Sequence, residues 1–219
     1  MSLISRRDVL MTAISASVVA AWPAVAAAPT YLRLPEKIPA LEGTLCKLFA
    51  YDCPFCFRAE RQIDAKLFER VQKAGLKIAA LSMPARGRYG LVATQFLSAM
   101  QVADEQKGIA LTDSASRFKA VKDALYWAYH RQGERWSSGE AAIIDVMQKA
   151  SRLDQSEIND LMLHPATAQK MHQSLLAQEA GKAYGIPAYL VNGQYLIVMK
   201  SMKTLDDFYS AVMQAASLK

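Results

Sequence analysis

The amino-acid sequence predicts an α/β fold in which a long helical segment interrupts a small sheet. Two apolar, strand-like runs flank a helical stretch before residue 83, helical patterns alone follow from about residue 90 to 184, and strand patterns return at 188–198. A chain of 219 residues with 52% apolar composition is long enough for one such domain with a large insertion. These three observations predict the element order β-α-β, helices, β-β-α.

The first 28 residues differ in kind from the rest of the chain. Arg6 and Arg7 precede a nearly uncharged apolar run that ends in small residues at 24–28, which is the pattern of an export signal peptide. The paired arginines resemble a twin-arginine (Tat) signal, and an ordinary Sec signal that carries two arginines is the alternative. Either signal predicts that residues 1–28 are removed and that the mature protein lies in a bacterial periplasm.

The first elements of the mature chain form a strand-helix-strand unit. Residues 45–51 and 76–82 read as buried strands, because they are apolar on both alternating faces. Residues 54–74 carry apolar side chains at helical spacing, and Gly75 is a stop signal. A crossover of this kind predicts two parallel strands.

The middle of the chain predicts an inserted helical subdomain at residues 90–182, within a thioredoxin-like domain made of residues 29–89 and 183–219. Successive apolar faces at helical spacing are separated by breaks at 108–112, 133–139, 151–155 and 164–165. We expect the aromatic residues of this segment to fill its interior rather than to bind a ligand: Tyr126, Trp127, Tyr129 and Trp136.

Strand patterns return at 188–191 and 194–198, separated by Asn192-Gly193. This dipeptide between apolar runs predicts a hairpin with a type I′ turn, since both central residues of that turn need positive φ. A last helix is expected to begin at Thr204, which has Asp207 in the spacing of a capping box.

The motif Cys53-Pro54-Phe55-Cys56 lies at the junction of the first strand and the first helix. Pro54 suits the first helical turn, so Cys53 is expected at or next to the helix N-cap and at its exposed edge. Unpaired backbone donors and the helix dipole would there lower the pKa of the Cys53 thiol and make it reactive. Cys56, one turn further in, would be the buried resolving thiol.

Two other interpretations of the motif are weaker. Zinc would need two more ligands, but there is no second Cys-X-X-Cys and the three histidines all lie in the helical segment. A structural disulfide that closes so short a loop would restrict the unfolded chain little. The third cysteine, Cys46, lies in a core strand and is expected to be a buried, inert thiol. Redox chemistry explains the motif best.

A second motif, Gly185-Ile186-Pro187-Ala188, precedes the strand at 188–191. Together with the strand, Cys-X-X-Cys, helix and helical insertion, it resembles the DsbA family of thioredoxin-fold thiol-disulfide oxidoreductases over residues 44–219. The resemblance implies that Pro187 is cis and faces the cysteine pair, and that Ile186 offers its backbone to an extended substrate. The chain departs from the best-known members at Phe55, where they carry histidine.

This resemblance implies a periplasmic enzyme that donates its Cys53–Cys56 disulfide to thiols of exported proteins. It implies no dissociable cofactor, no metal, a monomer, and reoxidation by a quinone-linked membrane protein of DsbB type. The formal net charge of +6, without a lysine-arginine tract, gives no indication of a nucleic-acid partner. The rival functions are a disulfide isomerase or reductase whose site is kept reduced, and a non-catalytic periplasmic chaperone.

The residues around the cysteine pair carry two further expectations. Phe55 and Phe57 are expected to form an exposed aromatic rim that suits apolar, unfolded substrate segments, with Pro54 beside them. Asp52 is expected to be a solvated charge that slightly opposes thiolate formation at Cys53.

Overall fold

The computed structural model describes residues 29–218, so the expected export peptide lies outside the described residues. Before the insert, the elements are β1 (Tyr31–Arg33), β2 (Thr44–Phe49), α1 (Pro54–Ala59), α2 (Ala65–Lys73) and β3 (Lys77–Ser82). The insert contains α3 (Gly90–Gln106), α4 (Arg117–His130), α5 (Glu140–Ser151), α6 (Gln155–Leu163) and α7 (Pro165–Tyr184). The chain ends with β4 (Ala188–Val191), β5 (Tyr195–Ile197) and α8 (Leu205–Ala216).

The strands form a five-stranded mixed sheet in the order β1-β5-β4-β2-β3. Strands β2 and β3 pair in parallel, as the strand-helix-strand pattern predicts, and the other neighbours are antiparallel. The three-residue edge strand β1, antiparallel to β5, was not predicted. Three residues are too few to show a strand period.

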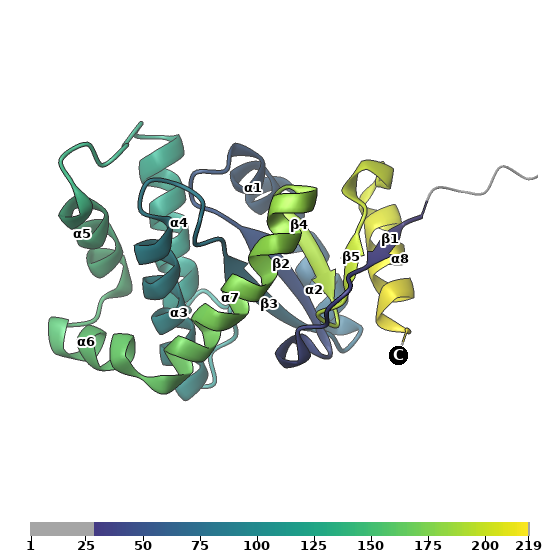
Figure 1. Cartoon of the computed structure of the whole chain (residues 1–219), viewed down its shortest axis with the longest axis horizontal. Coiled ribbons are helices and arrows are strands. Elements are labelled where there is room, and N and C mark those ends of the chain that lie inside the picture. The colour runs from purple at the N-terminus through teal and green to yellow at the C-terminus, as the bar shows by residue number, and fades with distance from the viewer. Residues whose placement is uncertain (1–28, 219) are drawn as a thin grey trace, which may run out of the picture.

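Both faces of the sheet are covered, which explains why all six residues of β2 are buried. Leu45 belongs to an apolar cluster with α2 and α8, whereas Cys46 and Leu48 belong to a cluster with the helical insert. Figure 1 shows the insert at one end of the molecule and α8 at the other. Lys47 shares the strand face of Leu45 and points toward the helical run after the cysteine motif.

The helix expected at 54–74 is interrupted. Its central turn, Glu60–Asp64, is a π-helix between α1 and α2, and Gly75 follows the run with φ of +93°. Gly75 therefore acts as the predicted stop signal, since a positive φ favours glycine. π-Helical turns inside α-helices are rare and frequent at functional sites.

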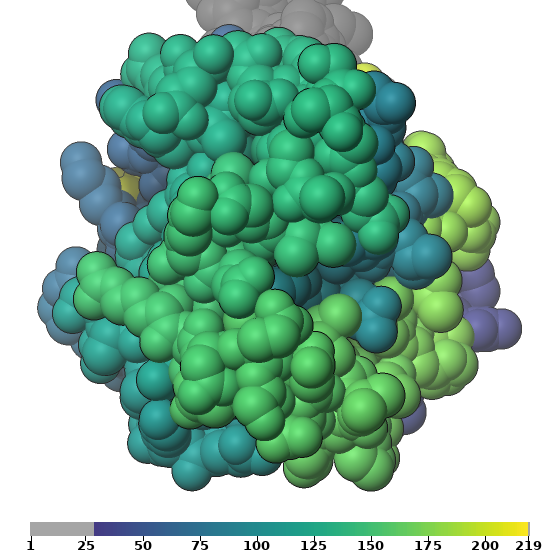
Figure 2. All heavy atoms as spheres, turned by 90° about the vertical axis from the view of Figure 1, so that its left-hand side faces the viewer, coloured from purple at the N-terminus to yellow at the C-terminus, as the bar shows by residue number. Residues whose placement is uncertain are grey.

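The five helices between β3 and β4 form the helical insert, which is seen end-on in Figure 2. Helix α3 packs against β3, α4 and α7. Tyr126 and Trp136 are each 1% exposed and fill the interior as predicted, and Tyr129 packs partly buried against them. The expectation for Trp127 is wrong, because its side chain is 57% exposed. One step along a helix rotates a residue by about 100°, so Trp127 leaves the face on which Tyr126 lies.

The hairpin and the last helix follow the sequence closely. Asn192 and Gly193 have φ of 53° and 67°, and the Gln194 N–H donates to the Val191 carbonyl across 3.1 Å. Gln194 belongs to the loop, so β5 begins one residue later than expected. Both bonds of the predicted capping box at the start of α8 are present. Within residues 29–218, no helix has the length and apolar content that crossing a membrane requires.

Candidate active site

Cys53 is the N-cap residue of α1, directly after the turn that follows β2. Its extended backbone allows its sulfur to accept a hydrogen bond from the Cys56 N–H across 3.1 Å. Pro54 occupies the first helical position, where a missing N–H loses no intrahelical bond. The local geometry therefore agrees with the placement predicted from the motif.

The surroundings of the two thiols push their pKa values apart. A hydrogen bond from the Cys56 side chain, opposed by burial and aided by the backbone N–H groups of Cys56 and Phe55, lowers the pKa of Cys53 to about 7. The positive charge of Arg86 contributes in the same direction. Burial, followed by the interaction with Cys53, raises the pKa of Cys56 well above its usual range. Near neutral pH, these shifts favour a thiolate at Cys53 over a thiolate at Cys56.

The loop before β4 lies against the Cys53 sulfur, although 133 residues separate Cys53 from Ile186 in sequence. The Ile186–Pro187 peptide bond is cis, as expected, and the Cys53 thiol donates to the Ile186 carbonyl across 3.4 Å. A partner chain that displaced this thiol-carbonyl contact would find an accepting backbone group beside the sulfur.

A cavity of about 480 Å³ adjoins Cys53 and is lined among others by Phe55, Arg86, Gly181 and Ile186. The Phe55 ring is 61% exposed, as predicted for the rim, and Pro54 is exposed beside it. Cys53 itself is only 2% exposed, which contradicts its expected place at an open edge. The neighbouring loop covers the thiol, and the cavity supplies the approach to it.

Two other expectations near the motif are wrong. Phe57 is half-buried and stacks on His130 of α4, with ring centroids 4.8 Å apart, so it does not belong to an exposed rim. Asp52 is half-buried rather than solvated, and its Oδ1 is buried without a hydrogen-bond partner among residues 29–218. Cys46 is fully buried as predicted, and burial raises the pKa of its thiol.

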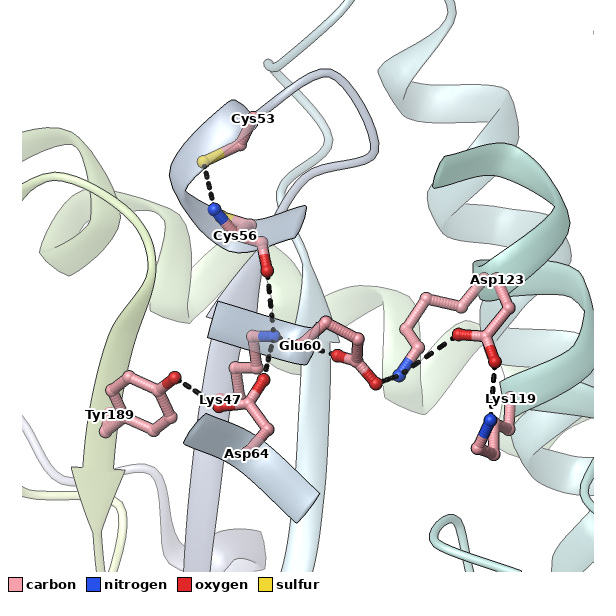
Figure 3. A network of polar contacts seen from close by, with 9 residues as sticks. Lys47, Cys53, Cys56, Glu60, Asp64, Lys119, Asp123 and Tyr189 are labelled. Atoms are coloured by element: carbon pink, nitrogen blue, oxygen red, sulfur yellow. Dashed lines mark hydrogen bonds and ion pairs between the residues drawn. The ribbon is translucent and has the colours of Figure 1, made fainter. Parts of the chain in front are cut away.

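Sequence reasoning missed a network of charged residues behind the motif, which Figure 3 shows. Lys47 of β2, 2% exposed, forms ion pairs with Glu60 across 2.9 Å and with Asp64, and donates to the Cys56 carbonyl across 3.4 Å. Tyr189 of β4 donates to Asp64, and Lys122 of α4 pairs with Glu60. The sequence signal for this network is Lys47 itself, a lysine inside an otherwise apolar strand.

Within the described part of the chain, no cluster of three or more His, Cys, Asp or Glu side chains could hold a metal ion. The chemistry that the arrangement supports is thiol-disulfide exchange, because it pairs a thiol of lowered pKa beside a cavity with a fully buried thiol of raised pKa.

Comparison with known proteins identifies relatives with this chemistry. No family model matches the chain. Thiol:disulfide interchange protein DsbL from Lelliottia amnigena and DsbL from Escherichia coli O6:H1 are each 33% identical over 189 residues, or 85% of this chain and 85% of the relative.

Solved structures support the same relationship. DsbL from Salmonella enterica serovar Typhimurium superposes with a TM-score of 0.82 at 32% identity, over 87% of this chain and 96% of that structure. DsbA from Klebsiella pneumoniae, at 14% identity and a TM-score of 0.67 over 86% of this chain and 95% of that structure, shares the fold. The identity, the coverage and the agreement of the folds together show that this oxidoreductase belongs to the DsbL thiol:disulfide interchange proteins of the DsbA family.

Proposed function

We propose that this protein is a periplasmic oxidase that introduces disulfides into exported proteins through Cys53 and Cys56. The observation that carries the proposal is the contrast between the two thiols. Cys53 has a pKa lowered to about 7 and adjoins a cavity, whereas Cys56 is fully buried with a raised pKa. A stabilised Cys53 thiolate favours the reduced enzyme, and this makes its disulfide a better oxidant.

The exchange proceeds in two steps. A substrate thiolate attacks the Cys53 sulfur of the oxidised enzyme, the Cys53–Cys56 bond breaks, and Cys56 leaves as a thiolate that takes up a proton. A second substrate thiolate then attacks the substrate sulfur of the mixed disulfide, and Cys53 leaves as a stabilised thiolate. The two substrate thiols release two protons when they ionise and lose two electrons in forming the disulfide. The enzyme retains the electrons as a Cys53 thiolate and a Cys56 thiol, which takes up one proton while the other goes to solvent.

The substrate is bound by the rim of the motif and by the loop before β4. Ile186 pairs its backbone with an extended substrate segment, Pro187 holds that loop against Cys53, and Phe55 and Pro54 offer apolar contact. The 3.4 Å contact from the Cys53 sulfur to the Ile186 carbonyl and the 61% exposure of Phe55 support these roles. A quinone-linked membrane protein of DsbB type then accepts the two electrons.

The rival functions predict different behaviour of the Cys53→Ala variant. We measure oxidative refolding of a reduced secreted protein by stoichiometric oxidised enzyme, and suppression of aggregation of an unfolded protein as a separate assay. An oxidase loses all oxidative activity in Cys53→Ala, whereas activity retained in the aggregation assay alone would identify a chaperone. The in vivo redox state separates the remaining rival: a predominantly oxidised Cys53–Cys56 pair fits an oxidase, and a predominantly reduced pair an isomerase or reductase.

Export through residues 1–28 is tested by the double substitution Arg6→Lys and Arg7→Lys. A twin-arginine signal should lose periplasmic delivery in this variant, because its receptor reads the arginine pair. A Sec signal would retain delivery, since two lysines preserve its basic region.

A further inference from the structure

Lys47 occupies a position that ordinary sheet packing would give to an apolar side chain. It lies in the middle of β2 between the buried residues Cys46 and Leu48, with its side chain 2% exposed. A buried ammonium group costs several kcal/mol unless its charge and its donors are matched. The acceptors and negative charges around the Lys47 ammonium therefore indicate its role.

All three N–H donors of the ammonium have acceptors: Asp64, Glu60 and the Cys56 carbonyl. Both carboxylates come from the π-helical turn Glu60–Asp64, directly after the helix that carries the cysteines. The Cys56 carbonyl also accepts the Glu60 backbone N–H, so Lys47 adds a second bond to the first turn of α1. The strand is thereby fastened to the turn that holds both cysteines (Figure 3).

Each of the two carboxylates also binds a side chain from a further element of the fold. Glu60 gives one oxygen to Lys47 and the other to Lys122 of α4, and Asp64 accepts from Lys47 and from the Tyr189 hydroxyl. Burial lowers the pKa of Lys47, but the charges of Asp64 and Glu60 outweigh burial and raise it, so the lysine stays protonated. A permanent positive charge is thus kept behind Cys56.

This charge matters because each half of the exchange cycle requires a Cys56 thiolate. Besides Lys47, the ionisable side chains that interact with Cys56 or with the carboxylates behind it are Cys53, Glu60, Asp64, Lys122, Tyr126 and Tyr189. Of the two lysines, Lys47 is the one that donates to the Cys56 carbonyl, and its charge lowers the pKa of Cys56 against the effect of burial.

We propose that Lys47 is a positioning residue for thiol-disulfide exchange, which holds the Cys56 carbonyl and stabilises the Cys56 sulfur whenever that sulfur is negatively charged. This inference rests on the proposed function of the Cys53–Cys56 pair. In the resolving step, the Cys56 thiolate attacks the Cys53 sulfur of a mixed disulfide, the bond from Cys53 to the partner sulfur breaks, and the partner leaves as a thiolate that takes up a proton. In the opposite direction Cys56 is the leaving thiolate, and Lys47 assists it in the same way.

The test is the pH dependence of the resolving step. Reduced protein is mixed with oxidised glutathione, quenched in acid at successive times, and the glutathione adduct is followed by mass spectrometry. Lys47→Met should shift the pH profile of resolution upward by about one unit, as expected for the loss of a neighbouring opposite charge. Below the midpoint the rate should fall about threefold, since a tenfold smaller thiolate fraction is partly offset by higher nucleophilicity.

Two variants serve as controls. Lys47→Arg keeps the charge and should restore the wild-type profile. Lys149→Met removes a lysine of an exposed ion pair on α5 and should change nothing. A purely structural role for Lys47 would lower the yield of folded protein without moving the profile.

A wild-type pH profile in folded Lys47→Met, or a profile in Lys47→Arg shifted as far as in Lys47→Met, would overturn the inference. If Lys47→Met does not fold, the double variant Lys47→Gln and Asp64→Asn removes the cation without leaving Asp64 unpaired. Its pH profile should shift upward by less than that of Lys47→Met, because the negative charge of Asp64 is removed together with the positive charge of Lys47. Some upward shift should remain, because Lys47 is the group that contacts the Cys56 carbonyl, and an unchanged profile would again overturn the inference. Failure of wild-type enzyme to oxidise substrates would instead refute the proposed function.

Discussion

Raising the pH from about 6 to about 9 should stabilise the folded, reduced protein through Cys53. The pKa of this thiol is about 7 in the folded protein and 9.0 in its ordinary state, which we take for the unfolded chain. A folded-state pKa below the unfolded value stabilises the protein fully above the unfolded pKa, and the effect disappears as the pH falls through the folded pKa. Two pKa units correspond to about 2.7 kcal/mol, of which about 2 kcal/mol develops between these pH values.

The measurement is urea unfolding under reducing conditions, followed by tryptophan fluorescence, at several pH values. Cys53→Ser is the matched control, because it removes this one titration and keeps Cys46, Cys56 and His130. The difference in unfolding free energy between the wild type and Cys53→Ser should grow by about 2 kcal/mol over this pH range. A difference that does not change with pH would show that Cys53 has an ordinary pKa in the folded protein.

The remaining predictions concern stability away from the redox pair, with urea unfolding as the common measurement. Cys46→Ala should lower the free energy of unfolding by about 1 kcal/mol, because this thiol is buried in the core, and should leave exchange with glutathione unchanged. Loss of exchange in this variant would show that Cys46 has a redox role. Gly193→Ala should cost about 1–3 kcal/mol, since φ is positive and a Cβ would lie 2.2 Å from the Ile38 carbonyl oxygen. Trp136→Ala should cost about 3–5 kcal/mol and Trp127→Ala less than about 0.5 kcal/mol. Equal costs would contradict their opposite exposures of 1% and 57%.

Local rules were sufficient to predict that Cys53 is the N-cap residue of its helix. A strand end, Pro54 at the first helical position and a cysteine before it determine an N-cap sulfur, and the structure has that sulfur bonded to the Cys56 N–H. The contact between Cys53 and Ile186 is different, because 133 residues and the whole insert separate them. No periodicity predicts such a contact, and it was inferred from the resemblance to a known family.

Side-chain direction explains part of what the sequence did not reveal. Phe55 and Phe57 are two helical steps apart and thus differ in direction by about 200°, so one faces solvent when the other faces α4. Applied to this pair, helical geometry would have excluded an exposed rim that contained both rings.

The charged network was beyond local rules for another reason. Lys47 finds its partners on a helical run and, through Glu60, on the insert, and each of these elements taken alone shows an ordinary charged residue. Only the tertiary fold shows that their charges are shared and buried.

The ion pair between Lys122 of α4 and Glu60 has a practical consequence for chimeras of this protein. The insert does more than line the cavity beside Cys53, because Lys122 also balances the charge of Glu60 behind the cysteine pair. Grafting the four-residue motif and its helix onto a thioredoxin-like scaffold without α4 would leave Glu60 with Lys47 as its one cationic partner in this network. A graft of the motif therefore has to transfer α1, the turn Glu60–Asp64 and α4 together, as one unit.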